Sequence, residues 1–155
     1  MAANIVAPTL IQFLEGNLKA IYTATDSEAF DDAFKAFLPE GDHATITLNG
    51  EKISRAQYKK VLQAETSDAT KGTVTFQGPS QILAKGDTQA GTAGLAFTAN
   101  ITKKLIVEGV TVVTSVLIAV IEEHKSHHYF HGVHGGVTDH KRIVRLDQVI
   151  SEQNN

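Results

Sequence analysis

The sequence contains no cysteine, which removes several kinds of chemistry at once. Without thiols the chain has no disulfide framework, no thiol nucleophile and no thiolate ligand for a metal ion. A chain that needs no disulfide is compatible with a reducing compartment.

The chain also lacks an excess of positive charge and a long apolar run. Its formal net charge is −3, whereas nucleic-acid binding depends on clustered Lys and Arg. The most apolar run, Val110 to Ile121, is about half the length that crosses a bilayer. The N-terminus "MAANIVAPTL" has no basic segment of the kind that opens a secretory signal. We therefore expect a cytoplasmic protein that binds neither nucleic acid nor membranes.

What the chain does have is enough length and apolar content for one core. With 155 residues, of which 42% are hydrophobic, it predicts a single domain over residues 1–155. The first third shows the periodicity of amphipathic helices. Pro8 suits a first helical turn, the pairs Thr25–Glu28 and Ser54–Gln57 form capping-box patterns, and Pro39–Gly41 ends the second helix. Asn49-Gly50 predicts a hairpin turn between two short strands.

From Gly72 onward, alternating β-branched residues predict long strands. We expect strands over 73–84, 89–107, 110–123 and 141–150, with Gly78-Pro79 bending the first. The polar tail "SEQNN" is expected to fray. Three helices followed by a four-stranded antiparallel meander predict an α+β fold, with the helices on one face of a curved sheet.

This order of elements, the "ATITLNG" hairpin and the closing strand "RIVRLDQVIS" resemble the NTF2-like superfamily, in particular its SnoaL-like branch and small fungal members. The resemblance covers nearly the whole chain and implies a cone in which the sheet wraps around the long helix. Such cones often enclose a ligand pocket and commonly dimerise through the outer sheet face. Members include isomerases, cyclases and dehydratases as well as non-enzymatic scaffolds, so the fold alone does not assign the function.

Aromatic side chains on the helices and sheet could line a pocket for a small, largely apolar molecule, without a built-in cofactor. The same side chains could equally form a packed core. Gln148 alternates with Leu146 and Ile150, so we expect it on the interior face, where a polar group needs a partner. The candidate ligand-binding residues are Phe13, Tyr22, Phe34, Phe37, Tyr58, Phe97 and Leu146.

The sequence lacks the groups used by the ketosteroid-isomerase branch of this superfamily, an aspartate base with a tyrosine and a protonated aspartic acid. The first short strand carries no acid, and the middle of the first helix reads Gly16, Asn17 and Leu18. His43, just ahead of that strand, is the candidate acid or base, with Gln148 as substrate polariser. A solvated histidine is the simpler interpretation. Three functions stay open. The first is a ligand-binding protein, with or without acid–base isomerase, cyclase or dehydratase activity. The second is a non-catalytic binding or interaction module, and the third is a metal-responsive protein.

The third function depends on "HKSHHYFHGVHGGVTDH", which holds six of the seven histidines. Pairing the apolar centres of the adjacent strands leaves residues 124–139 without a partner, so we expect a loop that is irregular over His127–Gly136. The histidine spacing would suit a metal on a helix. The glycines disfavour a helix, however, and no carboxylate lies between His124 and Asp139 to complete a site. We therefore prefer a mobile loop to a specific metal site.

In the run 110–121, neither alternate set of residues is polar, so the strand should be covered on both faces. We assign the even-numbered set to the outer face because it is more uniformly β-branched. A homodimer is expected there. We also expect Arg145 and Asp147 to pair on this face, alongside Ile143 and Val149. The residues assigned to the dimer contact are Val112, Thr114, Val116 and Ile118.

Overall fold

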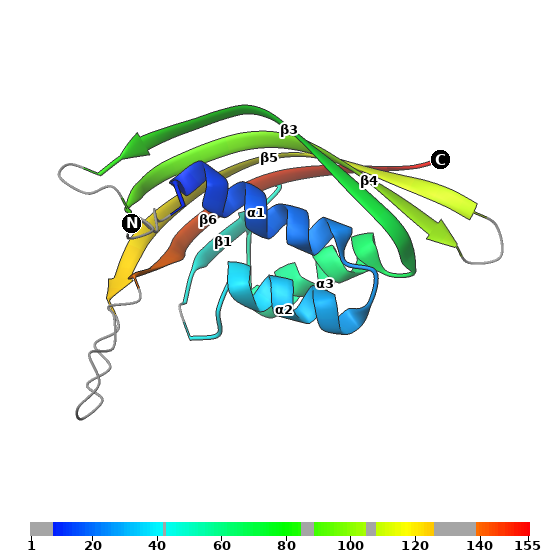
Figure 1. The fold of residues 1–155 in the computed structure, drawn as a ribbon, viewed down its shortest axis with the longest axis horizontal. Helices are drawn as coiled ribbons and strands as arrows, with labels where there is room; N and C mark the ends of the chain where they lie inside the picture. The colour runs from blue at the N-terminus through cyan, green and yellow to red at the C-terminus, as the bar shows by residue number, and fades with distance from the viewer. Residues whose placement is uncertain (1–7, 42, 85–88, 105–107, 126–138) are drawn as a thin grey trace, which may run out of the picture.

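Figure 1 shows the computed structural model, which describes residues 8–41, 43–84, 89–104, 108–125 and 139–155. Three helices lie on the concave side of a curved sheet: α1 (Leu10–Thr23), α2 (Ser27–Phe37) and α3 (Arg55–Thr66). The strands are β1 (Thr45–Leu48), β2 (Glu51–Ile53), β3 (Ala69–Leu83), β4 (Gly91–Lys104), β5 (Glu108–Lys125) and β6 (Asp139–Asn154). Within these ranges no helix is long and apolar enough to span a membrane.

The helices begin at capping residues close to those predicted. Ser54 forms the expected capping box with Gln57 at the start of α3. The cap of α2 is one residue later than expected, because Asp26 rather than Thr25 accepts the Ala29 amide at 2.7 Å. Caps of this kind each stabilise a helix by about 1 kcal/mol.

The sheet has six strands in the order β2-β1-β6-β5-β4-β3. Strands β3 to β6 form the predicted antiparallel meander. The β1–β2 hairpin joins the same sheet, because β1 pairs in parallel with β6, where Thr45 lies opposite Arg145. The predicted bend in β3 is a register shift between Gln77 and Ser80, with Gly78 at φ 57°. The expected α+β architecture, with helices on one face of a curved sheet, is confirmed.

The two ends of the β5–β6 pair differ from the prediction. Residues Ser151 to Asn154 pair with β5, so the expectation of a frayed tail is wrong for them. The Thr111 hydroxyl donates to Asn154 Oδ1 at 2.9 Å, which ties the polar tail to its neighbour. At the other end, pairing continues to Lys125 opposite Asp139. Residues 124, 125 and 139 were expected in the loop, but they belong to the strands. The segment His127–Gly136, predicted to be irregular, lies outside the described residues.

A bulge in β6 changes which residues face the core. The β5–β6 register shifts so that Val144 has no direct partner in β5. As a result Ile143 and Leu146 are both buried although they are three residues apart. The expectation that Ile143 shares the outer face with Val149 is therefore wrong. The expected interior position of Gln148 is confirmed, since it is 2% exposed.

The core fills the space between the helices and the concave sheet face. On β5 the odd-numbered residues from Thr111 to Ile121 are buried and the even-numbered ones point outward, as predicted. Helix α1 packs very close to β3 at Gly72, where an added Cβ would lie 1.9 Å from the Tyr22 carbonyl oxygen. Only glycine permits that approach of backbone to backbone.

Candidate functional site

Five buried polar side chains form the interior cluster, which lies between the helices and the sheet. The Tyr22 hydroxyl donates to Glu65 Oε1 at 3.0 Å. The Tyr58 hydroxyl donates to Gln148 Oε1 at 2.5 Å, and Gln148 Nε2 donates to Ser115 Oγ at 2.8 Å. None of these five residues is more than 2% exposed. The cluster therefore joins α1, α3, β5 and β6 inside the core.

The Gln148 branch of this cluster is fully hydrogen-bonded. The carboxamide accepts from Tyr58 and donates to Ser115, which donates in turn to the Val149 carbonyl at 2.8 Å. Buried polar groups that are all paired fix the relative positions of the elements that carry them. The partner that the sequence required for Gln148 is thus supplied by the protein itself.

The Glu65 branch is not fully paired. Burial raises the pKa of Glu65 to about 8, with Glu152 adding to the rise, while the Tyr22 hydrogen bond and Lys103 oppose it. Glu65 Oε2 is buried and no hydrogen bond of ordinary geometry reaches it from the described residues, although the Glu152 side chain is close enough to contribute to the raised pKa. Burial, reinforced by Glu65, also raises the pKa of Tyr22 and of Tyr58. At neutral pH the branch is a protonated carboxyl next to neutral phenols, which can donate protons but holds no strong base.

Sequence reasoning missed Glu65, although a signal was present. Tyr58, Leu62 and Glu65 follow the spacing of one helix face, and all three are buried. A glutamate on such a face is unusual, because carboxylates are almost never fully buried unless paired.

The predicted aromatic residues form one packed cluster with the rest of the core. Tyr22 lies 5.3 Å from Phe97 and Phe34 lies 6.0 Å from Tyr58, measured between ring centroids. Phe13 is half-buried at the edge of this cluster. The other candidate ligand-binding residues are at most 1% exposed: Tyr22, Phe34, Phe37, Tyr58, Phe97 and Leu146.

His43 lies apart from the interior cluster. It is exposed, has φ 50°, and lines a hollow of about 360 Å³ between the end of α2, β2 and the start of α3. We call this space the His43 hollow. Lys52 and Arg55 also line it, and neither was singled out from the sequence. The structure therefore brings Gln148 together with Tyr58 but not with His43.

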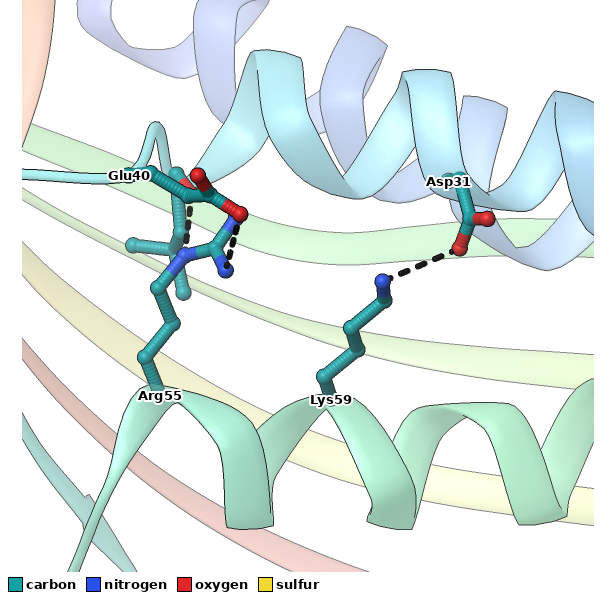
Figure 2. A network of polar contacts seen from close by, with 5 residues as sticks. Asp31, Glu40, Arg55 and Lys59 are labelled. Carbon is teal, nitrogen blue, oxygen red and sulfur yellow. Dashed lines mark hydrogen bonds and ion pairs between the residues drawn. The ribbon is translucent and has the colours of Figure 1, made fainter.

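Figure 2 shows how Arg55 is held at this hollow. Its Nε donates to the Leu38 carbonyl at 2.7 Å. Its guanidinium also lies 4.8 Å from the centroid of the Phe34 ring. Glu40 is 3.9 Å from Nη1 of Arg55. One turn further along α3, Lys59 pairs with Asp31 of α2 at 3.1 Å, so two contacts hold α3 against α2.

The outer sheet face, the convex side of β4 to β6, carries exposed apolar side chains. Val116, Ile118 and Val149 are 53%, 49% and 59% exposed. A shallow hollow of about 340 Å³ next to the bend of β3 is lined in part by Val116 and Ile118.

No metal site is found in the part of the chain that the structure describes, where no three His, Asp or Glu side chains are grouped for a metal ion. His124 and His140 are paired residues of β5 and β6. The other four histidines of the histidine-rich segment lie outside the described residues.

Comparison with known proteins shows likeness in fold alone. No protein-family model and no curated protein matches the sequence. A protein from Kribbella flavida aligns with TM-score 0.54 at 14% identity, covering 94% of this chain and 90% of that one. A conserved protein from Planctomyces limnophilus aligns with TM-score 0.55 at 7% identity, covering 92% and 94%. An NTF2-like protein of unknown function from Pseudomonas aeruginosa aligns with TM-score 0.48 at 8% identity, covering 88% and 91%.

The likeness to the first two structures extends over at least 90% of each chain. It agrees with the element order and sheet topology described above. The chain thus has an α+β fold with three helices on a curved, mostly antiparallel sheet.

Proposed function

We propose that the protein is a non-catalytic interaction module in which two copies meet through the outer sheet face. The observation that carries this proposal is the strip of apolar side chains on β5 and β6, where Val116, Ile118 and Val149 are each about half exposed or more. A contiguous apolar patch of this kind marks an interaction surface. The packed aromatic interior supports the same choice, because the space expected for a ligand is occupied by side chains.

The charges on this face suit a second copy of the same chain. Arg145 Nε lies 2.9 Å from Asp147 Oδ2, and the Thr47 hydroxyl also donates to Asp147. That hydrogen bond and Arg145 lower the pKa of Asp147, so this carboxylate stays ionised and paired. Arg142 pairs with Glu122 at 3.2 Å. Because these charges are neutralised within each copy, two identical faces can approach without like-charge repulsion.

The face is small for an interface between two copies. Three strands about 4.8 Å apart, with about eight residues of 3.3 Å each, span roughly 14 by 26 Å. A standard interface takes about 800 Å² of accessible surface from each partner, so a dimer would cover this whole face and belong to the small, weak interfaces. Burying the exposed halves of Val116, Ile118 and Val149 in both copies contributes roughly 4 to 9 kcal/mol, which is of the same order as the about 8 kcal/mol of a micromolar dimer.

Sedimentation velocity tests this proposal. We expect the wild type to be a dimer at tens of micromolar, and Val116→Lys with Ile118→Lys to be a folded monomer, because both residues are already exposed in the single chain. Ala20→Lys with Ala36→Lys adds the same charge at exposed positions of α1 and α2 and should remain dimeric. A monomeric wild type, or a dimeric Val116→Lys/Ile118→Lys variant, would refute the proposal.

A second candidate function is the binding and acid–base conversion of a small, largely apolar molecule inside the cone, as in SnoaL-like enzymes. Glu65 favours it: a buried carboxyl with a pKa of about 8 and an unpaired oxygen is suited to donate a proton near neutral pH. A high-resolution electron-density map of the protein as purified tests this candidate. Density for a small molecule within hydrogen-bonding distance of Glu65 Oε2 would support it, and ordered protein atoms alone in that region would exclude it.

A further inference from the structure

We infer that the His43 hollow binds a small molecule that joins an anionic group to a short apolar body. The hollow encloses about 360 Å³, which lies at the lower end of the range for small-molecule sites. It is separate from the outer sheet face and from the interior cluster. Since a water-sized group takes about 30 Å³, the space accommodates roughly ten non-hydrogen atoms.

The lining of the hollow includes an apolar part. Leu38 and Ile46 line it and are 2% and 1% exposed, so their contribution is continuous with the core. Ala44 and Ile53 are only partly buried against that core and also line the hollow. An alkyl or aryl group placed here would cover apolar surface that is still in contact with water.

Among the described residues of the lining, Lys52 and Arg55 carry positive charge and none carries a carboxylate. Lys52 and His43 are exposed, and within the described ranges Lys52 makes no ion pair. Arg55 is fixed through its Nε by the Leu38 carbonyl, which leaves its terminal nitrogens for other partners. Glu40 competes weakly for them, because it is 3.9 Å away and its side chain is 82% exposed. An anionic group therefore finds two positive charges at this hollow, one of them held in place.

The start of α3 adds to this preference. Ser54 caps the helix and lines the hollow together with Arg55, the first helical residue. The N-terminal end of a helix of 12 residues carries a partial positive charge that favours anions. The site thus combines side-chain charge, backbone dipole and an apolar surface, and a carboxylate on an eight-carbon chain satisfies all three.

An NMR titration of the uniformly ¹⁵N-labelled protein with sodium octanoate tests the inference. We expect saturable shifts of the amides of Ala44, Lys52 and Ile53, and no such shifts with octanamide, which has the same body without the charge. Lys52→Gln should weaken binding about two- to tenfold, since one exposed charge is lost. Lys52→Arg should retain it. Lys60→Gln, an exposed change on α3 that does not line the hollow, should leave binding unchanged.

The same titration distinguishes the opposing outcomes. Equal binding of octanamide and octanoate would show that charge is not recognised, and the inference would fail. Shifts confined to Val116 and Ile118 would show that octanoate coats the outer sheet face instead, with the same consequence. Saturable binding at the hollow by the Val116→Lys/Ile118→Lys variant would show that the site does not depend on the proposed dimer.

Discussion

The Tyr22 hydroxyl on α1 donates at 3.0 Å to the carboxyl of Glu65 on α3, 43 residues further along the chain. Both side chains are at most 1% exposed, and no hydrogen bond of ordinary geometry reaches the other oxygen of Glu65 from the described part of the protein. The contact therefore joins two helices through an ionisable group that the folded protein keeps protonated. Folding and proton uptake are linked at this position.

Glu65→Gln should change how stability depends on pH. The pKa of Glu65 is about 8 in the folded protein against 4.5 for a free carboxyl, so between these values the folded state binds more protons than the unfolded chain. The free energy of unfolding should therefore fall as pH rises from about 4.5 to about 8, by a few kcal/mol. The variant should lack this decline and be more stable than the wild type at pH 8.5. Urea unfolding across this range measures it, with Glu51→Gln, an exposed change, as control.

Tyr58→Phe should destabilise the protein through Gln148. The change removes the donor to Gln148 Oε1 and leaves a buried oxygen unpaired, which costs about 1 to 3 kcal/mol. In a double-mutant cycle, Gln148→Leu should lower the free energy of unfolding less in the Tyr58→Phe protein than in the wild type, because the two residues share one hydrogen bond. Strictly additive effects in urea unfolding would mean that this hydrogen bond contributes nothing.

Two glycine-to-alanine changes should have opposite effects. At Gly72 a Cβ would meet the Tyr22 carbonyl oxygen at 1.9 Å, so Gly72→Ala must displace α1 or β3 and should lower stability by several kcal/mol. At Gly16 nothing lies within 4 Å of the added Cβ, and alanine should stabilise α1 by up to about 1 kcal/mol. Thermal melts of the two variants provide the measurement. A Gly72→Ala protein as stable as the wild type would contradict the packing of α1 on β3.

Zinc should have little effect on thermal stability. No carboxylate lies between His124 and Asp139, and the chain has no thiolate to complete a site. Only a specific site would stabilise the fold by linkage at physiological free zinc. A rise of several degrees in Tm that is abolished by His128→Ala or His131→Ala would instead support a metal-responsive protein. Differential scanning calorimetry with and without zinc makes the comparison.

Local patterns in the sequence were sufficient for the helices, the meander and the outward face of β5. They work because periodicity reports the burial of one face at a time. Features that depend on contacts between residues far apart in the sequence could not be predicted from local patterns. The bulge at Val144 inverts the alternation within β6, and the parallel pairing of β1 joins residues 100 positions apart, such as Thr45 and Arg145.

The candidate sites illustrate the same limit. The interior position of Gln148 followed from alternation along one strand, and the structure confirms it. Its partners Tyr58 and Ser115 lie on other elements, so no local pattern could identify them. The His43 hollow is likewise formed by parts of α2, β2 and α3 that meet only after folding.

The place of β6 in the sheet also affects how the chain can fold during synthesis. Of the six strands described, β6 is synthesised last, yet it lies between β1 and β5 in the middle of the strand order. Until it is released, the β1–β2 hairpin has no sheet to join, and β5 presents an unpaired edge beside its valine and isoleucine side chains. Contacts across such long stretches of chain form slowly. A nascent chain that has not yet released β6 therefore exposes the apolar edge of β5, the kind of unpaired strand edge that favours aggregation.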